Sequence, residues 1–299
     1  MSDLRDELAQ LLGYADLEPH FGAVETVGRE VSGNAEVLNL RFETFDGEVA
    51  PSWFVLPERR TGPVPAVLYL HAHGNRYDIG RQELFDGRRA LQSAYCEKLI
   101  ALGFAVLCVE MPCFGARQEP NESSRSKAHL WNGTTLFGRM LHELRCGMTF
   151  LCEHPEIDEK RIVTLGISMG GTQAYWLAAM DERIAAAVSL CSFADLRCLV
   201  KSGNHDKHGH YMSVPGLLKV ASTGQIAGLV APRPIFIGAG MKDWSSPPDC
   251  FDMARAELEQ LYRHRSAQKS LRFHVEPDGG HEETSAVREA VLRFLRAMV

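Results

Sequence analysis

The sequence has no apolar run long enough to cross a membrane and no block of basic residues. A membrane-spanning helix needs about 18–20 apolar residues in succession, and no stretch of the 299-residue chain approaches that length. Lysine and arginine number 32 against 38 aspartate and glutamate, which gives a formal charge of −6. A chain of this charge without a basic cluster is a poor candidate for binding nucleic acid or an anionic membrane. We therefore expect neither among its partners.

The start of the chain also lacks the basic residues and the unbroken apolar stretch of a secretory signal. Residues 3–12 alternate charged side chains with leucine, which predicts a short amphipathic helix. Such a helix is able to pack on its own domain or on a second copy of the chain, so a homo-oligomer stays open. We expect a cytoplasmic protein whose partner is a small molecule.

None of the eight cysteines stands in a C-x-x-C pair, the spacing typical of many metal and redox sites. Cys108 and Cys191 lie in strand-like apolar runs, where a thiol behaves as a small hydrophobic group. Cysteines in a reducing cytoplasm rarely form disulfides. We therefore expect all of them to be free thiols.

The composition is otherwise that of an ordinary folded domain. Hydrophobic residues make up 45% of the chain and charged residues 23%, which excludes a disordered protein. A chain of this length buries roughly three-quarters of its unfolded surface. Since no linker, repeat or low-complexity stretch divides it, we expect an N-terminal helical extension over residues 1–34 and one domain over residues 35–299.

Six short, nearly continuous apolar runs are typical of strands buried on both faces of a parallel sheet. They are Val64–His71, Phe104–Glu110, Arg161–Ile167, Ile184–Leu190, Pro234–Gly238 and Leu271–Val275. Helical i, i+3/i+4 spacing of apolar residues occupies residues 84–102, 136–153, 169–180, 249–264 and 285–298. This alternation predicts an α/β fold with a doubly wound, mostly parallel sheet flanked by helices.

An Asp-Gly pair separates two further β-like runs, Val37–Phe45 and Val49–Leu56, and predicts a hairpin. The sheet should therefore begin with an antiparallel pair. Two stretches, at about 111–135 and 193–230, resist regular assignment because they are rich in Gly, Pro and polar residues. Both follow a predicted strand, so we expect loops that cover a site at the carboxyl edge of the sheet, where α/β proteins bind ligands.

The strongest chemical signal is the pentapeptide GISMG at 166–170, which stands between a predicted strand and a helix of small residues. This is the G-x-S-x-G nucleophile elbow in the strand–turn–helix context that it requires. Small neighbours let the backbone turn tightly, so the side chain of Ser168 projects from the apex. A free serine is a weak nucleophile and needs an adjacent base.

The base and the acid are expected after the last two strands. His281 follows the final strand and two glycines, which places its imidazole at the sheet edge. Asp243 is the first carboxylate after the preceding strand, and its role would be to orient the His281 ring. Asp249 is the rival acid, but it follows two prolines at the start of a predicted helix. The order Ser168, Asp243, His281 is the order of an α/β-hydrolase triad.

Acyl transfer also needs hydrogen-bond donors for the oxyanion of the tetrahedral intermediate. One is the backbone amide of Met169, directly after the nucleophile. The second is expected in the loop at 71–75, where we favour the amide of His73 over that of Gly74. His71 and His73 lack a third ligand at a matching position, so we expect no metal site.

Over roughly residues 35–299, the chain resembles the α/β-hydrolase superfamily and, within it, the dienelactone hydrolase and acetyl xylan esterase-like branch. The resemblance rests on LYLHAHGN, GISMGG, APRPIFIGAGMKDWSSPPD, PDGGHEE and the cover segment HGHYMSVPGLLKVASTGQIAGLVAPRP. It implies a Ser–Asp–His triad, hydrolysis of small esters and no cofactor. Dienelactone hydrolases proper use a cysteine nucleophile, so lactone specificity is not implied for a chain with Ser168. The usual His-Gly pair of the oxyanion loop reads His71-Ala72 here.

These features together predict a serine esterase. We expect a small acyl group such as acetyl, because the cover loops show little sign of a long apolar lid. His210, Tyr211 and Trp244 are the expected pocket-lining residues. Three alternatives stay open: a serine peptidase of the prolyl-oligopeptidase type, an acyltransferase, and a non-catalytic ligand-binding protein on a hydrolase scaffold.

Overall fold

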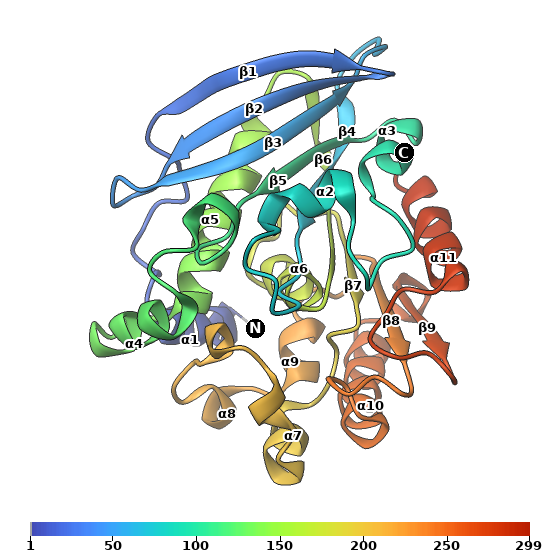
Figure 1. Cartoon of the computed structure of the whole chain (residues 1–299). Helices are drawn as coiled ribbons and strands as arrows, with labels where there is room; N and C mark the ends of the chain where they lie inside the picture. The colour runs from blue at the N-terminus through green and yellow to red at the C-terminus, as the bar shows by residue number, and fades with distance from the viewer. Residues whose placement is uncertain (1) are drawn as a thin grey trace.

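The computed structural model describes residues 2–299, and within them one nine-stranded sheet runs through the molecule (Figure 1). The strand order is β1-β2-β3-β5-β4-β6-β7-β8-β9. The strands are β1 Val24–Ser32, β2 Ala35–Glu43, β3 Val49–Pro57, β4 Val64–Leu70, β5 Ala105–Val109, β6 Ile157–Ile167, β7 Ala186–Leu190, β8 Ile235–Gly240 and β9 Leu271–Glu276. β4 to β9 pair in parallel, whereas β1, β2 and β3 are antiparallel. The predicted fold class, the antiparallel start included, is confirmed.

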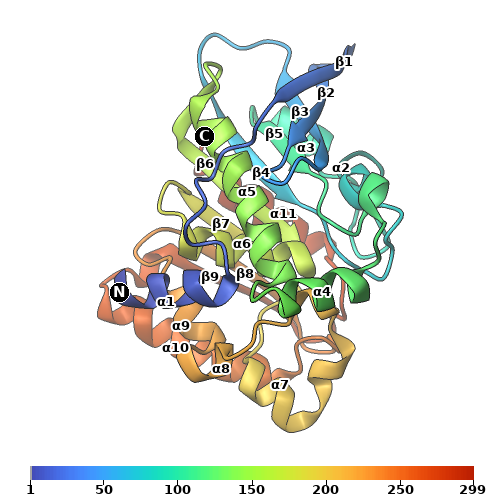
Figure 2. The same cartoon turned by 90° about the vertical axis from the view of Figure 1, so that its left-hand side faces the viewer.

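Helices cover both faces of this sheet (Figure 2). They are α1 Ser2–Leu12, α2 Glu83–Asp86, α3 Cys96–Ala101, α4 Glu122–Trp131, α5 Leu136–Glu153, α6 Met169–Met180, α7 Leu196–Ser202, α8 Leu217–Val220, α9 Thr223–Gly228, α10 Pro248–His264 and α11 Ser285–Arg296. Among the described residues, no helix is both long and apolar enough to pass through a bilayer.

The two faces of the sheet form two separate cores. In β4, Val67 and Tyr69 belong to the core under α2, α3 and α11, whereas Leu68 and Leu70 belong to the core under α1, α5, α6 and α10. This follows from the two-residue period of a strand, which points successive side chains to opposite faces. Because both faces are buried, each residue of the strand is apolar, and this explains the continuous hydrophobic runs in the sequence.

The N-terminal region is only partly helical. α1 forms as predicted and packs on its own domain, since Leu8 is buried and Arg5 Nε donates to the carbonyl of Ala179 at 2.7 Å. β1, however, pairs with β2 over Val24–Ser32, so the sheet begins before the predicted boundary at residue 35. All nine residues of β1 are exposed, and the strand therefore lacks the apolar face that a sequence pattern detects.

Two other expectations are corrected by the structure. The helix expected over residues 84–102 is two short helices, α2 and α3, separated at Gly87, whose backbone φ of +67° ends α2. The expected cover loops contain regular structure: α4 lies within 111–135, and α7, α8 and α9 lie within 193–230. These helices are short. α4, α7 and α9 begin at the polar capping residues Asn121, Asp195 and Ser222, and α8 begins after Gly216, so the sequence around them has the composition of a loop.

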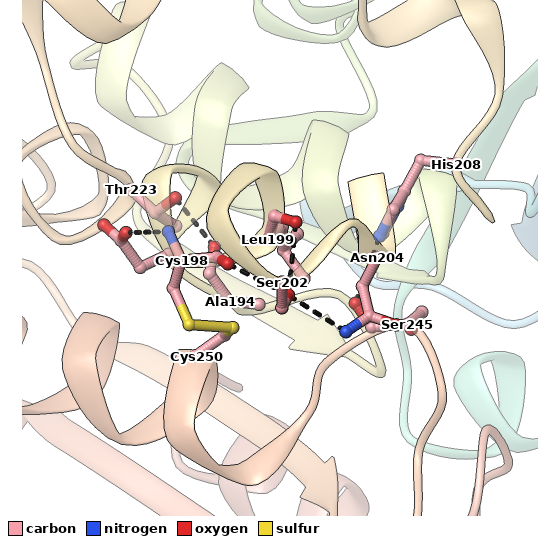
Figure 3. The surroundings of a disulfide bond; sticks show 10 residues. Ala194, Cys198, Leu199, Ser202, Asn204, His208, Thr223, Ser245 and Cys250 are labelled. Carbon is pink, nitrogen blue, oxygen red and sulfur yellow. Dashed lines mark hydrogen bonds between the residues drawn. A yellow bond between two sulfur atoms is a disulfide. The ribbon is translucent and has the colours of Figure 1, made fainter. Parts of the chain in front are cut away.

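The expectation that every cysteine is a free thiol is wrong, because Cys198 and Cys250 form a disulfide (Figure 3). The two residues are 52 positions apart and carry no spacing signal. Cys198 lies in α7, which follows β7, and Cys250 lies in α10, which follows β8. Because β7 and β8 are parallel neighbours, the segments that follow them leave the same edge of the sheet side by side. The other six, which are free, are Cys96, Cys108, Cys113, Cys146, Cys152 and Cys191.

We expect the double substitution Cys198→Ser and Cys250→Ser to lower the free energy of unfolding by about 2–4 kcal/mol, because the crosslink closes a long loop in the unfolded chain. Urea unfolding measures this, with Cys152→Ser at a half-buried free thiol as the matched control. In the denatured wild type, alkylation without reductant should label six cysteines, whereas labelling of all eight would show that the bond is absent.

Candidate active site

Ser168 stands at the apex of a tight turn between β6 and α6, with backbone angles φ +59° and ψ −121°. A residue other than glycine rarely adopts a positive φ, and such backbone strain is typical of functional turns. The turn presses against β4, since a Cβ atom built on Gly170 would overlap the carbonyl oxygen of Leu70, and one on Gly166 would overlap the backbone of Gly170. Only glycine fits these two positions, which is the physical reason for the flanking residues of the motif.

The structure brings the three predicted triad residues together. His281 Nε2 lies 3.0 Å from Ser168 Oγ, and His281 Nδ1 lies 2.9 Å and 3.0 Å from the two carboxylate oxygens of Asp243. Asp243 is buried, whereas the rival Asp249 is exposed in the first turn of α10. The three side chains stand on the turns after β6, β8 and β9, at one edge of the sheet.

Ser245 is a member of this cluster that the sequence analysis missed. Its amide and its hydroxyl both donate to Asp243 Oδ1 at 2.7 Å, and its Oγ lies 3.0 Å from His281 Nδ1. An aspartate that accepts from the residue two positions later forms an Asx turn. The Asp-Trp-Ser sequence was therefore the available signal. The turn orients the carboxylate toward the imidazole.

The loop at 71–75 offers two backbone amides beside Ser168. The amide of Ala72 donates to the buried Glu83 at 3.0 Å, and the amide of Asn75 donates to His73 Nδ1 at 3.1 Å. Between them, the amides of His73 and Gly74 make no hydrogen bond to any other residue within 2–299. The amide of Met169, at the first position of α6, has no partner within its helix.

Glu122, from α4, fixes the side chain of His73. Its carboxylate accepts from His73 Nε2 at 2.9 Å, from the Tyr77 hydroxyl at 2.6 Å and from the Tyr211 amide at 2.7 Å. Burial raises the pKa of this carboxyl, but the donors from His73, Tyr77 and Tyr211 outweigh it, and the net pKa is lowered. The His73 side chain thus points at α4, and the contact holds the 71–75 loop in place. No sequence signal pointed to Glu122.

A cavity of about 620 Å³ contains Ser168 and His281 on its wall. Tyr211 and Trp244 line it as predicted, and the Trp244 ring centroid lies 5.1 Å from that of His281. His210 does not line it. The neighbouring His208 does, with Nε2 lying 3.1 Å from the carbonyl oxygen of Ser245, and burial lowers the pKa of His208. His210 is exposed and belongs to an adjoining cavity.

His71 lies beneath this loop as a neutral hydrogen-bond bridge. It is fully buried, its Nε2 accepts from the Met111 amide at 3.1 Å, and its Nδ1 donates to the carbonyl of Ala72 at 3.2 Å. Burial lowers its pKa to about 3. The ring nitrogens of His71 and His73 are all engaged by hydrogen bonds, so neither ring is presented as a metal ligand.

The comparisons with known proteins agree with this architecture. The sequence profile of the prolyl oligopeptidase family matches residues 138–298, which include the Ser168, Asp243 and His281 cluster. The chain is 36% identical over 297 residues to "Putative hydrolase YtaP" of Bacillus subtilis (strain 168), covering 99% of this chain and 98% of that protein.

Two solved structures share the fold. A "putative acetyl xylan esterase" from Bacteroides fragilis NCTC 9343 has a TM-score of 0.79 at 15% identity, covering 100% of this chain and 87% of that one. The glucuronoyl esterase from Solibacter usitatus has a TM-score of 0.71 at 16% identity, covering 98% and 92%. The sheet described above is thus an α/β-hydrolase fold.

The buried, neutral His71 makes stability depend on pH. Its pKa is about 3 in the folded chain and about 6.5 when unfolded, so the unfolded chain binds more protons between these values. The stabilisation is complete above pH about 6.5 and is lost as pH falls toward 3, with a slope of up to about 1.4 kcal/mol per pH unit. Urea unfolding at several pH values should show a shallower slope for His71→Gln than for wild type.

Glutamine keeps an acceptor for the Met111 amide but does not titrate. The matched control is His264→Gln, the same exchange at an exposed position of α10. Equal slopes for His71→Gln and wild type between pH 7 and pH 4 would contradict the buried, neutral state of His71.

Proposed function

Because the chain belongs to the prolyl oligopeptidase family and has the α/β-hydrolase fold, we propose that it is a serine hydrolase of small carboxylic esters. The observation that carries the proposal is the continuous hydrogen-bonded chain from Ser168 through His281 to Asp243 on the wall of an open cavity. A nucleophile, a base within 3.0 Å and a buried carboxylate that orients the base are the parts required for acyl transfer.

In the first half of the reaction, His281 Nε2 accepts the proton of Ser168 as Oγ attacks the ester carbonyl. Asp243 holds the Nδ1–H tautomer and stabilises the imidazolium that forms. The amides of Met169 and His73, with Gly74 as the alternative, donate to the oxyanion, and each such donor is worth about 3–4 kcal/mol of barrier. His281 then protonates the leaving alcohol, which produces an acyl-enzyme on Ser168.

In the second half, water takes the place of the alcohol. His281 accepts a proton from the water as it attacks the acyl carbonyl, and the same amides stabilise the second oxyanion. Collapse of that intermediate releases the acid and returns the proton to Ser168. The triad supplies the base, the acid and the nucleophile, so no cofactor is required by this scheme.

The similar solved structures are named as acetyl xylan and glucuronoyl esterases, which supports an ester as substrate. The name of the first supports a carbohydrate as the alcohol half, since acetyl xylan carries its acetyl groups on a carbohydrate. Trp244 supports the same choice, because its partly exposed indole ring stands beside His281, where the leaving group must lie. A flat aromatic face next to the leaving group is suited to the apolar face of a sugar ring.

The triad is tested by p-nitrophenyl acetate hydrolysis with Ser168→Ala, His281→Gln and Asp243→Asn. Loss of the nucleophile or the base should lower kcat about 10,000-fold or more, and the Asp243→Asn exchange should lower it about 1,000- to 10,000-fold. Asp249→Asn is the matched control and should keep wild-type kcat, with EDTA present throughout. Residual activity of Ser168→Ala above a tenth of wild type would exclude Ser168 as the nucleophile.

A peptidase is the second candidate, because the matching family is named for prolyl oligopeptidase. A peptide substrate with a free amino terminus brings a cation that needs carboxylates in the cavity. The charged residues that line the cavity are mostly cations instead: Arg76, Arg88, Arg89 and Lys207, against the single carboxylate of Glu282. This charge distribution favours esters over such peptides.

Alanyl-proline p-nitroanilide, used beside p-nitrophenyl acetate at equal enzyme concentration, separates the two candidates. We expect hydrolysis of the ester and at least a 100-fold lower kcat/KM for the anilide, since the cavity offers little to hold the amino terminus. A higher kcat/KM for the anilide would replace the esterase proposal with a peptidase. Lack of turnover of either substrate by folded protein would favour a binding function.

A further inference from the structure

A second cavity adjoins the first beneath the cover segment over residues 193–230. Its volume is about 390 Å³, which lies within the ~300–1,000 Å³ range of small-molecule sites. Five residues line both cavities, so the two share a common wall: Thr172, Ser192, His208, Gly209 and Tyr211. The second cavity therefore adjoins the cavity that contains Ser168.

Seven apolar side chains of the cover segment line the second cavity. They are Leu196, Leu199 and Val200 from α7 and Met212, Val214, Leu217 and Leu218 from the stretch that ends in α8. Polar side chains line it as well: His205, Asp206, His210 and Ser213 are exposed, whereas Thr172, Ser192 and His208 lie on the side that adjoins the first cavity. The cluster of apolar side chains in this lining favours an apolar group as the ligand.

The inner end of this cavity lies close to the nucleophile. The Thr172 amide donates to the carbonyl of Ser168 at 2.9 Å, so Thr172 stands one helical turn beyond Ser168 on α6. One turn of an α-helix rises about 5.4 Å. A chain attached to Ser168 Oγ therefore needs only a few bonds to reach the second cavity.

The geometry of the triad determines which half of the ester points toward the second cavity. His281 must reach the leaving oxygen to protonate it, so the alcohol half lies beside His281 and Trp244. Both residues line the first cavity and neither lines the second. The acyl half therefore lies on the other side of Ser168, toward Thr172 and Tyr211.

We propose that the second cavity is the acyl-binding pocket and that it takes an apolar acyl group longer than acetyl. The inference rests on the proposed ester hydrolysis and replaces the expectation of an acetyl group. That expectation relied on the absence of a long apolar lid from the cover loops, where the apolar residues of the 193–230 segment are scattered along the sequence. Folding gathers them around one cavity, which a methyl group would leave mostly empty.

The wall of this pocket is fixed in place. Cys198 lies in α7 between the lining residues Leu196 and Leu199, and its disulfide to Cys250 ties α7 to the first turns of α10 (Figure 3). The Asp195 amide also donates to the carbonyl of Cys250 at 2.8 Å. A pocket with a rigid wall should select acyl groups by length.

The test is a chain-length series of p-nitrophenyl acetate, butyrate, hexanoate and octanoate. We expect kcat/KM to rise with length, by up to about fourfold per buried methylene, and at least tenfold from acetate to octanoate. Val214→Phe, which fills the pocket, should lower the octanoate-to-acetate ratio at least fivefold. Val220→Phe, the same exchange on the same segment outside the cavity, should keep the wild-type ratio.

The outcomes separate the inference from the function on which it rests. A flat or falling series with Ser168-dependent acetate hydrolysis would overturn the acyl pocket and leave the esterase intact. If no ester is hydrolysed, calorimetric titration of Ser168→Ala with octanoate and acetate still tests the pocket. We expect octanoate to bind at least tenfold more tightly and Val214→Phe to remove the difference; equal affinities would overturn the inference.

Discussion

Parallel pairing of β6, β7, β8 and β9 is the constraint on which the whole site depends. Parallel strands end at the same edge of a sheet, so the turn after each strand delivers its side chains into the same space. Ser168 follows β6, Asp243 follows β8 and His281 follows β9, while Cys191 and Ser192 after β7 line the cavity between them. The apolar burial that stabilises these strands therefore also sets the distances within the triad.

The cover segments are positioned against this edge by polar contacts as well as by packing. Glu122 on α4 accepts from the oxyanion loop and from the cover segment at once, through His73 and the Tyr211 amide. His208 Nε2 donates a hydrogen bond to the carbonyl of Ser245, which lies in the same turn as Asp243. A buried hydrogen bond has a narrow range of lengths and angles, and these contacts therefore fix the cavity walls relative to the reacting atoms.

The sequence predicted what single segments encode. Six strands, the elbow at Ser168 and the order of the triad all follow from local patterns, and the structure has the strands and the elbow where the patterns indicate. β1 was not predicted, because its nine residues are all exposed and bury no apolar face. The 84–102 stretch has helical spacing, but Gly87 adopts a positive φ that a pattern of apolar residues does not contain.

What the sequence did not predict are contacts between segments that are distant in the chain. The disulfide partners, the bond from Glu122 to His73 and the cavity under α7 and α8 each depend on which strand lies beside which. Patterns within single segments do not show the order of the strands in the sheet. Ser245 is different, because the Asx turn that it forms with Asp243 is a local feature that the spacing of the two residues already allows.

The crosslink between α7 and α10 has a consequence for the dynamics of the site. In many enzymes a loop or lid closes over the substrate, and its opening then limits turnover. Here the disulfide ties α7 at Cys198 to the first turn of α10, a few residues after Asp243, and this link limits how far α7 is able to move away from that turn. A crosslink of this kind lowers the conformational entropy that the cover segment has to lose when a ligand binds against it.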